Sequence, residues 1–297
     1  MSTFSQLVDD TLLYLYGFTT LQDQATYLTA NISASATTIP IADATSISRG
    51  VLEVDDELIW VDTVDTTALT ATAPPYGRGY RSTTAATHAS GTRVVSGPLF
   101  PRVLVKSAIT QAIQAVYPDL WGIGTTTFTL NPAITTYALP AGTTKVLQVS
   151  WQSVGPTREW NPVRRWRLDQ HANTGAFNTG ATISVYDSIT PGRTVQVVYA
   201  KQPTALVNPT DDFATVTGLP ASAEDVIRYG AAYRLVPFFD SPHLSGMSAE
   251  ADFAAQQRPV GASSQLAKFM LQQYQVRLQE EARRLQDLFP VRSHYSR

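Results

Sequence analysis

Residues 264–289, read as SQLAKFMLQQYQVRLQEEARRLQDLF, are the segment that most constrains how this chain can fold. Apolar residues recur there at steps of three and four, which is the spacing of one side of an α-helix. The stripe consists of Ala267, Leu271, Tyr274, Leu278, Ala282, Leu285 and Phe289. Pro290 follows and ends the helix, because proline lacks a backbone N–H. A helix with one narrow apolar stripe is marginal alone, so we expect other helices to cover it.

Four further segments have helical spacing and supply the expected partners. They are residues 3–16, 102–117, 222–239 and a short segment at 248–257. Ser222 is expected to cap the third of these, because its hydroxyl can accept a hydrogen bond from a free backbone N–H. The predicted shared core consists of Phe4, Leu12, Val105, Ile109, Ile227, Leu271, Tyr274, Leu278 and Leu285.

Between the helical segments the periodicity changes to two, which is typical of strands. In residues 24–97, which we call the β module, short strands are expected at 51–54, 57–61 and 68–70. Asp55 and Asp56 are predicted to form the turn between the first two strands. Residues 125–219, which we call the second β domain, contain alternating runs at 145–151, 182–187 and 193–202.

The expected architecture is an α+β fold in which a helical bundle carries two small inserted β domains, each a barrel or sandwich. Residues 1–23, 98–124 and 220–297 would form the bundle, with 24–97 and 125–219 as the inserts. Residues 290–297 would form a C-terminal tail.

Composition excludes several classes of protein. The 297 residues have a formal net charge of −2, whereas a dedicated nucleic-acid binder is usually strongly basic. The absence of cysteine excludes disulfides and thiolate metal sites and fits assembly in a reducing cytoplasm. We expect neither a membrane span nor a signal peptide, because no long apolar run is present.

No pattern in the sequence predicts catalysis, a metal site or a cofactor. The four histidines, His88, His171, His243 and His294, have no metal-ligand spacing and are expected in turns or on the surface. The acidic residues of LEVDDELIWVD are expected at solvated strand edges, although they could also bind a cation. Residues 76–79, YGRG, are interpreted as a turn and not as a phosphate-binding loop, because no Lys-Ser or Lys-Thr follows.

Residues 158–167, REWNPVRRWR, form the main candidate interaction site. Arginine and tryptophan are common at protein interfaces and also suit nucleic acids. Three interpretations stay open: a solvated loop that covers its own tryptophans, a protein–protein contact, or a contact with DNA. The candidate residues are Arg158, Trp160, Arg164, Arg165, Trp166 and Arg167, with Arg292, Tyr295 and Arg297 of the tail as a second set.

Two resemblances to phage proteins follow from these residues. The β module, through Glu57-Leu58-Ile59 and the stretch from Arg78-Gly79 to His88, resembles a small β module of tailed-phage neck and tail proteins. The order of helices and β segments along nearly the whole chain resembles the head-to-tail adaptors of tailed phages, in particular the tubular adaptor of podophages. The extra β module departs from simpler adaptors.

The second resemblance implies a non-enzymatic virion protein of the phage neck, assembled in the bacterial host cytoplasm. It implies a homo-oligomeric ring of twelve copies that binds the portal protein and the next tail or nozzle protein. The C-terminal tail would dock against the portal. Genomic DNA would pass through the lumen without sequence-specific binding, and no membrane or cofactor is involved. The alternative is a peripheral tail protein whose β modules bind the host surface.

Overall fold

The computed structural model describes residues 2–19, 22–154, 158–237 and 262–289. These residues divide into two compact units that interleave along the sequence. One unit takes residues from 1–4, 112–227 and 274–297, and the other takes residues from 5–111 and 228–273. The predicted short helix at 248–257 lies outside the described residues.

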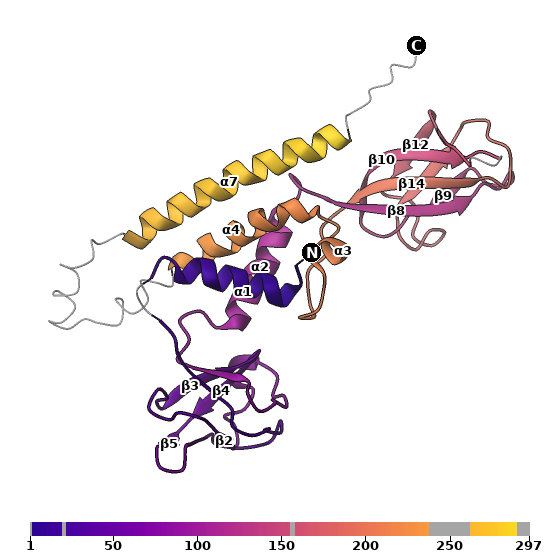
Figure 1. The fold of residues 1–297 in the computed structure, drawn as a ribbon. Coiled ribbons are helices and arrows are strands. Elements are labelled where there is room, and N and C mark those ends of the chain that lie inside the picture. The colour runs from indigo at the N-terminus through magenta and orange to yellow at the C-terminus, as the bar shows by residue number, and fades with distance from the viewer. Residues whose placement is uncertain (1, 20–21, 155–157, 238–261, 290–297) are drawn as a thin grey trace. The chain divides into compact units, whose positions relative to one another are not determined.

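The described α-helices fall near the segments with helical spacing, except for one five-residue helix within the stretch expected to form the second β domain (Figure 1). The α-helices are α1 (Phe4–Tyr16), α2 (Arg102–Ala115), α3 (Phe213–Thr217), α4 (Glu224–Leu235) and α7 (Ala262–Leu288). The described residues also form two short 3-10 helices, η1 (Tyr80–Ser82) and η2 (Ala221–Ala223). No described helix is both long enough and apolar enough to span a membrane.

The β module consists of two small sheets. The first has the order β1 (Gln24–Tyr27), β7 (Arg93–Ser96), β3 (Gly50–Val54) and β4 (Glu57–Val61). The second has the order β2 (Thr38–Pro40), β6 (Thr70–Thr72) and β5 (Thr63–Asp65). Apolar residues of both sheets, among them Ile39, Leu52, Ile59 and Ala71, are fully buried in one common cluster.

The predicted turn at Asp55-Asp56 is confirmed. Val54 pairs with Glu57 at the end of the antiparallel β3–β4 ladder, so the two aspartates form a two-residue connection. Asp55 has a φ of 52°, a left-handed conformation that aspartate tolerates better than most residues. The turn fixes the register of the hairpin and thereby places Glu57 on a buried position of β4.

The second β domain also consists of two antiparallel sheets, and its first strand begins at Gly122, three residues before the predicted boundary at 125. The first has the order β11 (Trp160–Pro162), β10 (Thr143–Gln152), β14 (Thr194–Lys201) and β8 (Gly122–Thr129). The second has the order β12 (Trp166–Asp169), β13 (Thr182–Val185) and β9 (Thr136–Ala138). Ile183, Val195 and Val197 are fully buried in its core, and the partly buried Trp166 packs against this core.

The expectation of a helical bundle that carries two small β inserts is wrong. The described residues form a β-rich fold with four sheets and only four helices of seven or more residues. The β segments are not appendages, because each of them encloses an apolar cluster of its own. Helical periodicity predicted the long helices, but the sequence analysis overestimated the share of the fold that they form.

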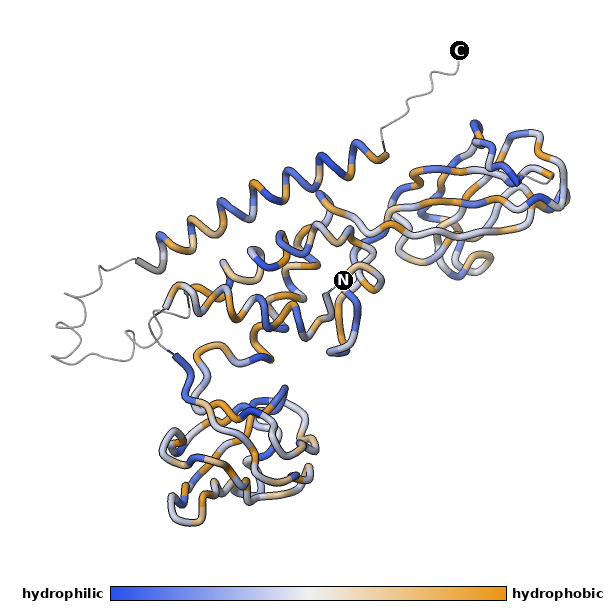
Figure 2. Tube along the Cα trace, viewed as in Figure 1, coloured by the Kyte–Doolittle hydropathy of each residue, from blue (hydrophilic) through white to orange (hydrophobic). Residues whose placement is uncertain are grey.

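Helix α7 is buried along one side, and the centre of that side differs from the predicted stripe. Met270, Tyr274, Glu281 and Leu285 are the buried positions, whereas Leu271, Leu278 and Ala282 are only half-buried. Figure 2 shows hydrophilic and hydrophobic residues alternating along the helix, as one-sided burial requires. The buried side therefore includes a carboxylate that the apolar pattern could not reveal.

Ser222 does not cap α4 as expected. It lies in η2, just before the helix, and its hydroxyl donates a hydrogen bond to Oε2 of Glu281 at 2.6 Å. The first turn of α4 instead carries Glu224 and Asp225, whose negative charges stabilise the helix by interacting with the positive end of its dipole. The carboxylate of Glu224 also accepts the hydroxyl of Ser2 at 2.7 Å.

Candidate functional site

The Arg/Trp segment, residues 158–167, lies at the edges of both sheets of the second β domain. It contains β11, the first two residues of β12 and the loop that connects them, and both strands are the outer strands of their sheets. Among the described strands, β11 pairs only with β10, and β12 pairs only with β13. The segment therefore lies on edge strands of both sheets.

Two contacts hold the loop between these strands in place. Val163 is buried, and its N–H donates to the carbonyl of Val149 at 2.9 Å. The carboxylate of Asp187 accepts the backbone N–H of Arg164 at 2.6 Å and the Nε–H of Arg165 at 3.2 Å. Partial burial of Asp187 favours the neutral acid, but these hydrogen bonds outweigh it and lower the pKa of Asp187.

The segment presents most of its cationic side chains to solvent. Arg158, Arg164, Arg165 and Arg167 are exposed, and among the described residues only Arg165 of these four forms an ion pair. Trp160 is 42% exposed. Trp166 is different, because it packs against the core of the second β domain. The structure thus separates one exposed tryptophan from one that belongs to the core.

The remaining predicted residues have the following positions. Phe4, Val105, Ile109, Ile227, Tyr274 and Leu285 are buried, and Leu12, Leu271 and Leu278 are half-buried. Arg292, Tyr295 and Arg297 lie outside the described residues.

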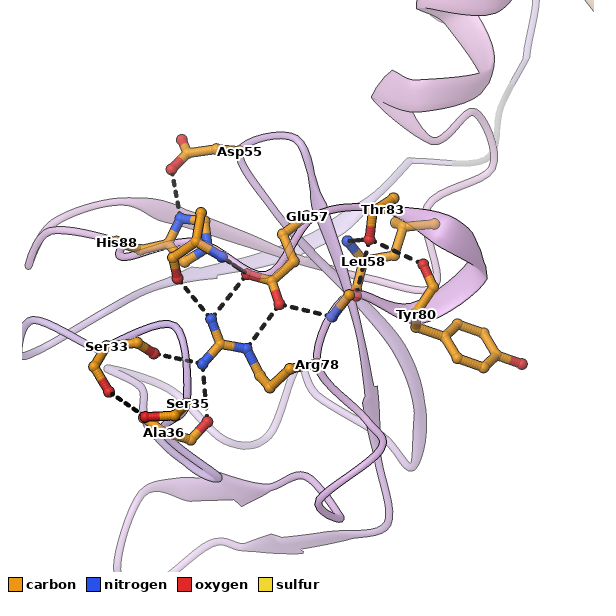
Figure 3. A network of polar contacts seen from close by, with 12 residues as sticks. Ser33, Ser35, Ala36, Asp55, Glu57, Leu58, Arg78, Tyr80, Thr83 and His88 are labelled. Atoms are coloured by element: carbon orange, nitrogen blue, oxygen red, sulfur yellow. Dashed lines mark hydrogen bonds and ion pairs between the residues drawn. The ribbon is translucent and has the colours of Figure 1, made fainter.

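A buried polar network in the β module was missed by the sequence analysis (Figure 3). The side chains of Glu57 and Arg78 are 1% and 5% exposed, and the Nε of Arg78 lies 2.7 Å from Oε1 of Glu57. His88 is equally buried, with Nε2 2.9 Å from Glu57 and Nδ1 2.8 Å from Asp55. Glu57 and Glu53 were expected at solvated strand edges and His88 on the surface or in a turn, and for these three residues the expectation is wrong.

Arg78 connects its own loop to three other segments of the β module. Its guanidinium donates two hydrogen bonds to Glu57 and further ones to the carbonyls of Ser33, Ala36 and Ala86. A planar guanidinium with five N–H donors is the side chain that can satisfy so many acceptors at once. The YGRG stretch is a turn, as interpreted, and its arginine fixes the module from inside.

Electrostatics favour the ionised form of Glu57. Burial alone would raise its pKa, but hydrogen bonds from Arg78, from the N–H of Ala86, from His88 and from the N–H of Gly79 lower the pKa to about 2. The described residues contain no group of three or more acidic, histidine or cysteine side chains that could hold a metal ion. The geometry is that of a satisfied structural ion pair.

A second polar cluster joins the β module to α2. The N–H of Arg102, in the first turn of that helix, donates to Oε2 of Glu53 at 2.6 Å. The ammonium of Lys106 lies 2.6 Å from Asp56, and the guanidinium of Arg102 binds Asp9 of α1. Burial raises the pKa of Glu53 to about 7, against the opposing influence of Arg102.

Comparison with known proteins adds one finding. A family model described as the SU10 adaptor protein matches residues 83–284, which is more than half of the chain. The matched range includes His88, α2, the second β domain, α4 and most of α7. None of the curated proteins matches the chain.

Proposed function

The chain belongs to the SU10 adaptor protein family of phage head-to-tail adaptors, and we propose that its copies assemble as a ring on the portal of a tailed phage. The family match over residues 83–284 carries this proposal, because it gives the chain a structural role in the virion. The proposed ring has twelve copies, and it continues the DNA channel from the portal to the next tail or nozzle protein. Genomic DNA passes through the lumen without sequence-specific contacts.

The Arg/Trp segment is the proposed contact of the second β domain with a neighbouring subunit or ring. Exposed arginines and a partly exposed tryptophan at a sheet edge are the residue types that dominate protein interfaces. The chain as a whole has a net charge of −2, so a neighbouring copy offers carboxylates to these arginines. The partner in this proposal is protein and not DNA, because one basic segment is a small electrostatic footprint for a duplex.

The C-terminal tail is the proposed portal contact. Arg292, Tyr295 and Arg297 supply two charges and an aromatic ring within six residues. Their replacement by alanine is expected to abolish the binding of purified ring to purified portal while leaving the mass of the ring unchanged. Unchanged portal binding by this triple variant would refute the role of the tail.

Mass photometry of the purified protein, with and without portal, tests the ring. The expected result is an assembly of about twelve copies, because a stable ring needs extensive interfaces between its subunits. A stable trimer that ignores the portal would instead support the alternative of a host-binding tail protein. Electron micrographs of the same samples distinguish a closed ring from an open oligomer of similar mass.

Charge reversal tests the Arg/Trp segment. The double variant Arg164→Glu and Arg167→Glu is expected to reduce assembly at least about tenfold, because it places like charges at the interface. Arg93→Glu is the matched control, since Arg93 is an exposed strand arginine outside the segment. Normal assembly of the double variant would show that the segment is only a solvated edge.

A further inference from the structure

A continuous row of side chains crosses the outer edge of β4 in the β module. Arg49 lies 3.7 Å from Asp62, and Asp62 accepts the indole N–H of Trp60 at 2.8 Å. The Trp60 and Tyr80 ring centroids are 5.5 Å apart, and the guanidinium of Arg81 lies 5.5 Å from the Tyr80 centroid. We call these five residues the aromatic–arginine row.

The loop that carries Tyr80 and Arg81 is anchored on its inner side. Arg78 holds it to Glu57, and the N–H of Gly79 donates to the same carboxylate at 2.9 Å. The hydroxyl of Thr83 accepts the N–H of Leu58 at 3.1 Å and donates to the carbonyl of Tyr80 at 2.9 Å. Figure 3 shows the Tyr80 ring pointing away from this network.

Backbone conformation in the loop indicates that its shape is imposed by these contacts. Arg81 and Ser82 have φ values of 53° and 65°, which non-glycine residues adopt at some cost. Gly77 cannot carry a side chain, because its Cβ would lie 2.5 Å from the carbonyl oxygen of Trp60. The loop lies along the outer edge of β4, where the carbonyl of Gly77 accepts the N–H of Trp60 at 2.8 Å, and Arg81 is exposed to solvent.

The chemistry of the row defines what it can bind. Trp, Tyr and Arg are the residues enriched at binding hot spots, and a pre-organised site loses little conformational entropy on binding. Arg81 is exposed, and no carboxylate of the described residues lies within ion-pair distance of it. A ligand that brings a carboxylate to Arg81 and an apolar group to the two rings would satisfy both features.

Net charge argues that this ligand is a protein segment and not nucleic acid. Residues 24–97 contain seven acidic side chains, four arginines and no lysine. A phosphate backbone would meet a net negative module, and Asp62 stands within the row itself. An acidic segment needs only local positive charge, which Arg81 supplies, because the charge of Arg49 is already paired with Asp62.

We propose that the aromatic–arginine row is a docking site for an acidic segment of another virion protein, which sets a carboxylate on Arg81 and an apolar side chain against Tyr80 and Trp60. This assigns a binding role to the β module that is separate from ring formation and from the Arg/Trp segment of the second β domain.

A photo-crosslinker in assembled virions tests the proposal. It replaces Tyr76, which is 74% exposed and adjoins Gly77, the residue whose carbonyl accepts the N–H of Trp60. The control position is Tyr27, 55% exposed on β1 at the opposite edge of the same sheet. The expected product at position 76 is a crosslink to an acidic protein segment, which position 27 does not form.

The Arg81→Glu variant provides the second arm. It is expected to lower the crosslink yield at least about tenfold without changing the melting temperature, whereas Arg93→Glu leaves the yield unchanged. Reversal of the charge in the crosslinked partner segment should restore the yield with Arg81→Glu. A crosslink to DNA, to a segment without acidic residues, or one insensitive to Arg81→Glu would overturn the proposal, as would no crosslink at all.

Discussion

Nε2 of His88 lies 2.9 Å from the carboxylate of Glu57, although 31 residues separate them in the chain. The other ring nitrogen of His88 lies 2.8 Å from Asp55, whose side chain is 60% exposed. One imidazole thus contacts a buried carboxylate and an exposed one. The two carboxylates offer a direct comparison of what burial contributes to the β module.

Glu57→Gln is expected to destabilise the β module strongly. The change leaves Arg78 as a buried charge without its counter-ion, which typically costs about 3–5 kcal/mol. Asp55→Asn, the control on the same histidine, should cost less than about 1 kcal/mol because its contact is exposed. Urea denaturation of both variants measures the difference, and equal effects would contradict the structural role of burial.

Acid should weaken the β module through the same carboxylate. The pKa of Glu57 is about 2 in the folded protein against an ordinary value of 4.5, so the folded state favours the ionised form. Its contribution is complete above about pH 4.5 and is lost as the pH falls toward 2. Unfolding free energies measured from pH 6 to pH 2 should fall less steeply for Glu57→Gln than for the original chain.

Glu53 should have the opposite pH dependence. Its pKa is raised to about 7, so the folded state binds a proton that the unfolded state releases near pH 4.5. Stability therefore declines as the pH rises from 4.5 to 7, by roughly 3 kcal/mol in total from this group. Glu53→Gln should remove this decline, since a neutral amide oxygen can still accept the N–H of Arg102. A decline of the same size in the variant would assign it to another group.

Ser222→Ala should destabilise the contact between η2 and α7. Glu281 is 1% exposed, and loss of the hydroxyl leaves its carboxylate with arginine partners alone. The expected cost is about 1–3 kcal/mol, as for other hydrogen bonds to buried charges. Ser48→Ala, at an exposed position, serves as the control and should change the unfolding free energy by less than about 0.5 kcal/mol.

Two neighbouring residues of α7 should respond differently to truncation. Met270 is fully buried and Phe269 is 48% exposed. Met270→Ala is expected to cost about 2–5 kcal/mol through lost burial and the cavity that remains. Phe269→Ala should cost much less in the isolated chain. Thermal denaturation of both variants tests this assignment. A larger loss of stability for Phe269→Ala than for Met270→Ala would show that the buried side of α7 is assigned wrongly.

Local patterns predicted the long helices and the strands β3, β4, β10, β13 and β14, but the strand expected at 68–70 is wrong, because residues 66–69 form a turn and β6 begins only at Thr70. The helical spacing at 3–16, 102–117 and 264–289 corresponds to α1, α2 and α7 within a few residues, and the Asp55-Asp56 turn was predicted directly. These features depend on neighbours in the sequence. The relative weight of helix and sheet depends instead on which segments enclose a core, and there the prediction was wrong.

The buried network could not be predicted, because it depends on long-range pairing. Glu57, Arg78 and His88 come from segments 21 and 31 residues apart, and no periodicity connects them. A signal was nevertheless present: Glu57 opens an otherwise apolar strand, and Arg78 stands between two glycines. Those residues also carried the resemblance to phage β modules. The Arg/Trp segment was found from composition alone, but only the structure separates Trp160 from Trp166.

The hydrogen bond between Ser222 and Glu281 also specifies the position of α7 along its own axis. If the helix shifted by one turn along its axis, Arg277 or Leu285 would lie opposite the hydroxyl of Ser222. Neither side chain can accept a hydrogen bond from that hydroxyl. Apolar contacts alone would tolerate such a slip, because the stripe repeats every turn. The carboxylate of Glu281 therefore distinguishes the observed position of α7 from positions that are shifted by one helical turn.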